Sequence, residues 1–318
     1  MKAKNIILTF EYKTRTWEVR RVLGRLLRRV FPKFRPRFLI ARLMGRDIPI
    51  QAFNHTIYVD GKDLCLAPAL MEDGVWEPRL TSFMRNVLRP GMTVVDIGAN
   101  IGYFSILAAA EIGKGGKVFA FEPGRRNIEL MKKNIEVNDF RNIVVVCAAV
   151  TAASGQTTLY TSETDYGDHR SYPVAQERSY VRGVPVGEKL RGEELVDAIA
   201  LDDYFKEFIG TVNFIKMDIE GAEYYALQGM KNLLRQSVNV VVMTEFWPGG
   251  MEVARTSPQM FLDEVRSLGF DVHLLPEEGP IRQATDKEVF SEISKTKNDI
   301  MNIVLCRPER RATLPENA

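Results

Sequence analysis

The stretch Val94–Gly102, VVDIGANIG, decides the fold, because it joins an apolar run to a turn that contains glycine. The apolar residues Thr93–Ile97 predict a strand, and the residues from about Ile101 to Ile112 predict the helix that follows. Gly98 and Gly102 allow the turn to bring backbone N–H groups and the helix N-terminus close to a ligand. The stretch therefore predicts a β-α unit with a ligand-binding turn.

The same alternation of strand and helix continues to the end of the chain. Further strands are expected at residues 118–121, 143–148, 212–217, 238–244, 272–275 and 301–306, and helices at 125–137, 223–234 and 259–268. The strands are continuous apolar runs, which is typical of strands covered by helices on both faces. The pattern predicts an α/β protein with a mostly parallel, doubly wound sheet.

The first 46 residues differ in charge from the rest of the chain. They contain 14 Lys and Arg and two acids, so they carry +12; the whole chain carries +2, which leaves −10 for the remainder. Apolar residues recur at helical spacing from Thr16 to Phe31, which predicts a basic amphipathic helix that ends at Pro32. Residues 16–43 could contact an anionic membrane surface or dock on the acidic remainder of the chain. A nucleic-acid partner is disfavoured, because the remainder is acidic and the basic segment resembles no binding module.

Four regions are expected along the chain. They are a basic N-terminal extension (1–50), a hairpin with a cap helix (51–90), a main domain (91–310) with a polar excursion at 160–198, and a tail (311–318). The hairpin is expected to pair Thr56–Val59 with Leu64–Leu66 around a turn at Asp60-Gly61. The three cysteines lie far apart without a C-x-x-C motif, so we expect no disulfide framework and a cytoplasmic protein.

Acidic and small residues at the strand ends point to the class of cofactor. Asp96 precedes the first glycine of the turn, where it would repel a pyrophosphate but suits a cofactor with an ammonium and a sulfonium group. The turn also lacks the third glycine of a dinucleotide fingerprint, which disfavours a nicotinamide-dependent oxidoreductase. Glu122 ends the next strand and could accept ribose hydroxyls, while Ala148, at the end of the third strand, leaves room for a flat base. S-adenosylmethionine is the cofactor expected.

A second group of acids follows the fourth and fifth strands. Asp218 shares one side of its strand with Lys216, and ligands of open α/β sheets bind at the carboxyl ends of strands. Glu220 and Glu245 reach the same rim, and with Asp218 they could hold Mg²⁺ through oxygen ligands. Glu223 is expected to stabilise only the N-terminus of its helix.

Together these motifs resemble the FkbM family of S-adenosylmethionine-dependent methyltransferases. The resemblance covers Trp76 to Cys306 and rests on DIGANIGYFS, the strand end FEP, KMDIEGAE and the later EFWP. It implies a Rossmann-like class I methyltransferase fold with a seven-stranded sheet whose last strand is antiparallel. It also implies cofactor contacts at Asp96, Gly98, Asn100, Gly102 and Glu122, with Asp218 beside the transferred methyl group.

The activity that the resemblance implies is methyl transfer to a hydroxyl of a small molecule, sugar or secondary metabolite. An aliphatic hydroxyl needs a group that removes its proton or polarises its oxygen. Asp218 and His169, in the excursion, are the candidate bases, and a cation held by the three acids is the alternative. A membrane-surface or nucleic-acid-binding protein that kept the fold without turnover is the second hypothesis.

Overall fold

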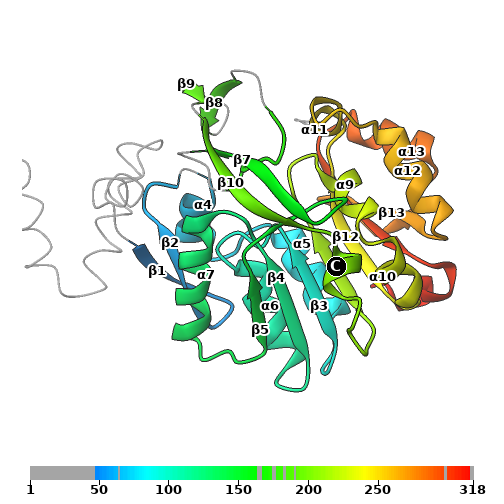
Figure 1. Cartoon of the computed structure of the whole chain (residues 1–318), viewed down its shortest axis with the longest axis horizontal. Coiled ribbons are helices and arrows are strands. Elements are labelled where there is room, and N and C mark those ends of the chain that lie inside the picture. The colour runs from blue at the N-terminus through cyan, green and yellow to red at the C-terminus, as the bar shows by residue number, and fades with distance from the viewer. Residues whose placement is uncertain are drawn as a thin grey trace, which may run out of the picture.

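The fold is built on one eight-stranded sheet. The computed structural model describes residues 47–63, 65–162, 167–173, 177–181, 184–189, 191–296 and 299–315 (Figure 1). The strand order is β14-β13-β15-β12-β11-β3-β4-β5. The strands are β3 (Thr93–Ile97), β4 (Lys117–Phe121), β5 (Ile143–Val146), β11 (Phe214–Met217), β12 (Val241–Phe246), β13 (Asp271–Leu275), β14 (Arg282–Gln283) and β15 (Met301–Cys306).

This order confirms the predicted Rossmann-like class I methyltransferase fold. Strands β5, β4, β3, β11 and β12 are parallel, and β15 enters antiparallel between β12 and β13. The prediction of seven strands is wrong by one: the two-residue strand β14 pairs with the edge strand β13. A two-residue strand has no periodicity that a sequence pattern could reveal.

Helices cover both faces of the sheet because successive strand residues point to opposite sides. On one face Val94, Phe214 and Val241 pack with α5 (Pro78–Val87) and α6 (Tyr103–Ile112). On the other face the next residues, including Val95 and Ile215, pack with the later helices. The remaining helices are α4 (Leu66–Asp73), α7 (Arg125–Val137), α8 (Leu201–Tyr204), α9 (Glu223–Gln228), α10 (Lys231–Gln236), α11 (Pro248–Val253), α12 (Pro258–Ser267), α13 (Asp286–Ile293) and the 3₁₀ helix η1 (Pro308–Thr313).

The hairpin before the sheet differs from the prediction. β2 (His55–Asp60) pairs with the preceding β1 (Asp47–Ala52), and the turn between them is Phe53-Asn54, both with positive φ. A turn does follow Asp60, whose carbonyl accepts from the Asp63 amide at 3.1 Å, but the predicted hairpin around it is wrong, because Leu66 begins α4 rather than a strand. Because β1 starts at Asp47, the hairpin also crosses the predicted boundary at residue 50.

The predicted helix 223–234 is two helices, α9 and α10, separated at Gly229. A Cβ on Gly229 would lie 2.1 Å from the carbonyl oxygen of Thr151. The chain therefore passes another segment too closely at Gly229 for any side chain. This close approach coincides with the end of α9.

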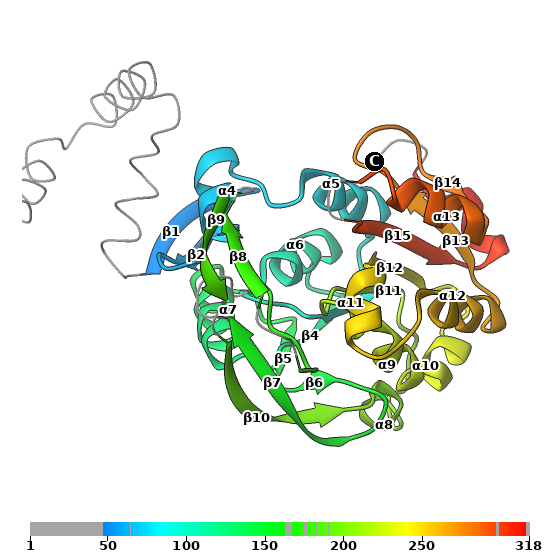
Figure 2. The same cartoon turned by 90° about the horizontal axis from the view of Figure 1, so that it is seen from above.

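The excursion 160–198 contains paired strands where the sequence indicated a mainly irregular connection. β7 (Gly155–Ser162) pairs antiparallel with β10 (Arg191–Ile199), and β10 also pairs with β6 (Ala149–Val150). β8 (Glu177–Val181) and β9 (Val184–Lys189) form a second hairpin at the far end (Figure 2). We call the segment Gly155–Ile199 the arm.

The predicted basic helix, and with it the expected membrane contact through residues 16–43, lies outside the described residues. Within the described ranges, no helix combines the length and the apolar character that crossing a membrane requires.

Candidate functional site

The glycine turn lies directly against the end of β11. A Cβ on Gly98 would lie 1.9 Å from the carbonyl oxygen of Asp218, and Gly98 has a φ of +76°. Asn100 also has a positive φ, and its Oδ1 is buried without a hydrogen-bond partner. The turn thus brings the two sequence motifs together and leaves one polar atom of Asn100 for a ligand.

Asp96 lies beneath this turn. Its carboxylate is almost fully buried, and its Oδ2 accepts a hydrogen bond of 2.6 Å from the Ser105 hydroxyl. Its Oδ1 is 3.8 Å from the Lys216 ammonium. Burial raises the pKa of Asp96, and Lys216 and Ser105 oppose that shift. Asp96 therefore links β3 to α6 through Ser105 and to β11 through Lys216.

Glu122 lies at the end of β4 and binds the same turn. Its Oε2 accepts from the Asn100 amide at 2.9 Å, and its Oε1 accepts from the Gly124 amide and the Asn127 side chain at 2.9 and 3.1 Å. Burial raises the pKa of Glu122 to about 6. Each carboxylate oxygen can accept two hydrogen bonds, so Oε2 retains room for a ligand hydroxyl.

Two other predicted residues lie near this end of the sheet. Ala148 is buried just after β5. His169 lies beside Glu122. Both side chains border Gly124: a Cβ on this glycine would lie 2.8 Å from Glu122 Oε1 and 2.9 Å from His169 Cδ2. The Ser162 amide donates to His169 Nδ1 at 3.1 Å. A ring nitrogen that accepts a hydrogen bond carries no proton, so the proton of this imidazole is on Nε2.

Lys216 is a buried cation between the two motifs. Its ammonium donates to Asp218 Oδ2 at 3.1 Å and to the Gly98 carbonyl at 3.3 Å. Although burial disfavours the ammonium, Asp218 and Asp96 raise the pKa of Lys216 well above its usual value. Lys216 therefore stays charged and fixes Asp218 against the glycine turn.

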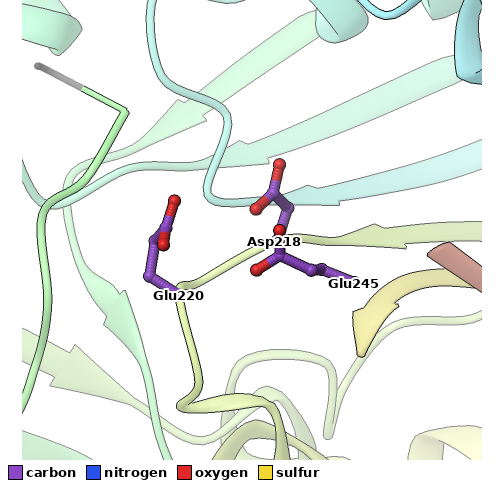
Figure 3. A group of neighbouring side chains, drawn as sticks. All are labelled: Asp218, Glu220 and Glu245. Atoms are coloured by element: carbon purple, nitrogen blue, oxygen red, sulfur yellow. The ribbon is translucent and has the colours of Figure 1, made fainter. Parts of the chain in front are cut away.

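Three carboxylates meet at the carboxyl ends of β11 and β12. Asp218, Glu220 and Glu245 each place one oxygen within 4.8 Å of the others (Figure 3). The pKa of Glu245 is raised well above its usual value, by burial first and then by Glu220 and Asp218. The structure thus brings together the three acids that the sequence proposed as a metal site.

Two further acids border this group. Glu77, which precedes α5, has a φ of +42°, and its pKa is raised to about 7 by burial and by Asp218. Sequence reasoning missed it, because Trp76-Glu77-Pro78 indicated only the start of a helix. Glu223 is the first residue of α9, and it accepts from the amide of Ile219 in the preceding loop at 3.0 Å, so it binds the loop and does not serve the helix N-terminus alone.

A short segment of the arm, residues 167–173, crosses from the cofactor side to the acids; we call it the strap. Its His169 lies beside Glu122, and its Tyr172 hydroxyl donates to the Glu220 carbonyl. Arg170 is paired with Asp168 at 2.7 Å and lies 4.7 Å from the centre of a Trp247 ring. The strap belongs to the polar excursion of the sequence, and it contacts both halves of the site.

The family assignment follows from a domain match over the residues that build this site. The model of the methyltransferase FkbM domain matches residues 96–272, more than half of the chain. The chain belongs to the FkbM methyltransferase family. Its matched region begins at Asp96 and includes Glu122, the strap and all three clustered acids.

The chain is also similar to other methyltransferases. Methyltransferase sdnD of Sordaria araneosa is 24% identical over 201 residues, 56% of this chain and 73% of that protein. A probable cobalt-precorrin-6B C(15)-methyltransferase of Sulfurisphaera tokodaii is 26% identical over 157 residues, 49% of this chain and 78% of that protein. The solved methyltransferase FkbM of Methylobacillus flagellatus superposes with a TM-score of 0.38 and 16% identity, over 71% of this chain and 50% of that one.

Proposed function

We propose that this FkbM methyltransferase uses S-adenosylmethionine to methylate a hydroxyl group of a small molecule, sugar or secondary metabolite. The observation that carries the proposal is the contact between the glycine turn and Asp218, fixed by Lys216. This contact joins a turn suited to a nucleoside cofactor with an acid suited to a hydroxyl.

The residues of the turn fit this cofactor. Asn100 has a buried Oδ1 without a partner, and Glu122 has an acceptor position on Oε2 for a ribose hydroxyl. Gly98 and Gly102 would line the approach, Ala148 would face the adenine, and Asp96 would support the turn from below. When bound, S-adenosylmethionine supplies an electrophilic methyl group on a sulfonium.

Asp218 is the residue we assign to the acceptor hydroxyl. A carboxylate can accept the hydroxyl proton as the oxygen becomes nucleophilic, and Lys216 keeps this carboxylate in one position. His169 is less suited to accept the proton, because Nε2 already carries one while Nδ1 accepts from the Ser162 amide. Holding acceptor and cofactor in line supplies much of the rate.

Replacing Asp218 tests the assignment. Asp218→Asn keeps the shape but removes the charge, so turnover should fall by about 10²–10⁴-fold, while S-adenosylhomocysteine affinity stays nearly unchanged. Turnover is measured with labelled S-adenosylmethionine against a panel of hydroxylated metabolites, and affinity by calorimetry. Asp263→Asn, on the exposed side of α12, is the matched control and should keep full activity. Normal turnover of Asp218→Asn would remove Asp218 from the chemistry.

The cofactor itself is tested separately. We expect calorimetric binding of S-adenosylhomocysteine and none of NAD, because the turn lacks the third glycine of a dinucleotide site. Binding of NAD alone would overturn the proposed function.

A further inference from the structure

The three clustered acids have the geometry of a cation site. One oxygen from each of Asp218, Glu220 and Glu245 lies within 4.8 Å of the other two, and Figure 3 shows the carboxylates gathered around one space. Asp218 and Glu220 come from the loop after β11, and Glu245 from β12, so two adjacent strand ends position them.

A second observation separates this group from an ordinary acidic patch. Glu245 Oε2 is buried and has no hydrogen-bond partner, although it lies among other carboxylates. Glu77 Oε2, near Asp218, is also buried without a hydrogen-bond partner. Lys216 is already bound to Asp218 and Gly98 and lies against Asp96. A buried carboxylate oxygen without a partner costs free energy unless a cation or a donor meets it.

We propose that Asp218, Glu220 and Glu245 bind one hard divalent cation of the Mg²⁺, Mn²⁺ or Ca²⁺ class. Oxygen ligands select these ions. Opposite ligand oxygens lie about 4.2 Å apart around Mg²⁺ and about 4.6–5.2 Å apart around Ca²⁺. The oxygens of the three acids lie within 4.8 Å of one another, inside the span of opposite ligands of Ca²⁺, so a small closure of the side chains would bring all three to one such ion.

This inference rests on the proposed function and refines one part of it. With the cation bound, Asp218 would be one of its ligands instead of the proton acceptor, and the coordinated acceptor hydroxyl would lose its proton to water because the cation lowers its pKa. Three carboxylates leave coordination positions for oxygens of the acceptor, and a bound divalent ion lowers the pKa of a hydroxyl that it coordinates. An acceptor with two neighbouring oxygens is the substrate class that such an ion would favour.

The test is titration of the full chain, freed of metal by chelation, with MnCl₂ and separately with CaCl₂. We expect one ion per chain by calorimetry, and for Mn²⁺ also by loss of its free electron paramagnetic resonance signal. Glu245→Gln and Glu220→Gln should each weaken binding by at least about tenfold, since affinity follows the number of charged ligands. Glu252→Gln, an exposed glutamate on the neighbouring helix α11, is the matched control and should bind as the unchanged chain does.

Thermal unfolding gives a readout that does not depend on turnover. Bound cation should raise the Tm of the unchanged chain by mass action. Glu245→Gln relieves repulsion among the acids, so its metal-free Tm should rise and the cation should add little. No binding at millimolar Mn²⁺ and Ca²⁺, or equal binding by the two glutamine variants and the control, would overturn the inference.

Cofactor calorimetry on the same protein keeps the two proposals distinguishable. S-adenosylhomocysteine binding without cation binding would reject only the cation site. Cation binding without S-adenosylhomocysteine binding would reject the proposed function and leave the site standing.

Discussion

The hydrogen bonds around Glu122 bear directly on its proposed role as the acceptor for a ribose hydroxyl of the cofactor. Its two oxygens would accept four hydrogen bonds, two on each, if a ribose hydroxyl joins Asn100, Gly124 and Asn127. Glu122→Gln has a single acceptor oxygen, so we expect S-adenosylhomocysteine affinity to fall at least about tenfold, the value of one charge-assisted hydrogen bond. Calorimetry measures this, with Glu129→Gln, an exposed glutamate of α7, as the control. Equal affinities would exclude Glu122 from the cofactor contacts.

Tyr172 is the residue through which the strap reaches the acids. Tyr172→Phe removes the hydrogen bond to the Glu220 carbonyl, and Tyr225→Phe removes a comparable bond of 2.9 Å to the Ala254 carbonyl. Each should lower the free energy of unfolding by about 1 kcal/mol. Only Tyr172→Phe should also change turnover and the pH profile, because Glu220 has a left-handed φ beside the site. If the two variants behave alike, the role of Tyr172 is structural alone.

At the level of single residues, the sequence predicts a site residue best where a reactive side chain also lies at the end of a predicted strand. Asp218 and Glu220 follow the buried strand β11, Glu245 is near the end of β12, and the topology of the sheet brings such positions to one rim. Glu77 has no such signal, since it lies between a tryptophan and a helix-starting proline. The contact of His169 with Glu122 depends on how the arm folds back, which no local pattern encodes.

Among the elements, the turn between β3 and α6 offers a direct test of close packing. Gly98→Ala would place a Cβ 1.9 Å from the Asp218 carbonyl oxygen, whereas Gly113→Ala, at the end of α6, meets nothing within 4 Å. Both glycines have positive φ, and Gly113 combines it with a ψ of −175°, so each variant should lose about 1–3 kcal/mol of stability from the backbone. Gly98→Ala should also lose cofactor binding, as measured by calorimetry. Retained binding would show that the turn can move away from β11.

The elements of the sheet were predictable because burial on both faces leaves an uninterrupted apolar run. β3 and β15 begin and end at the residues expected from that pattern. The hairpin was not predictable in the same way: its turn is Phe53-Asn54, and phenylalanine is rare at positive φ. Asp60-Gly61 is the stronger turn signal, but the chain after it forms α4, and β2 pairs with the preceding strand β1.

For the molecule as a whole, the clustered acids predict how stability depends on pH. Burial raises the pKa of Glu77 and of Glu223 from 4.5 to about 7. An acid whose folded pKa is raised stabilises the fold at low pH, and this contribution is lost as pH rises through the folded pKa. The free energy of unfolding of the chelated protein should therefore fall between about pH 4.5 and pH 7, and Glu77→Gln should flatten that decline. Urea titrations across this range measure it; a rise with pH would contradict the prediction.

The arm has a consequence for how this protein could change its substrate. Gly155 is paired with Ala198, so the arm leaves the main domain and returns to it at neighbouring points. A different loop could be inserted between these two residues without altering any strand of the central sheet. The strap, which lies over the acids, belongs wholly to this exchangeable piece. Grafting another arm would therefore change what borders the acids and Glu122, while the strands that position Asp96, Asp218 and Glu245 stay in place.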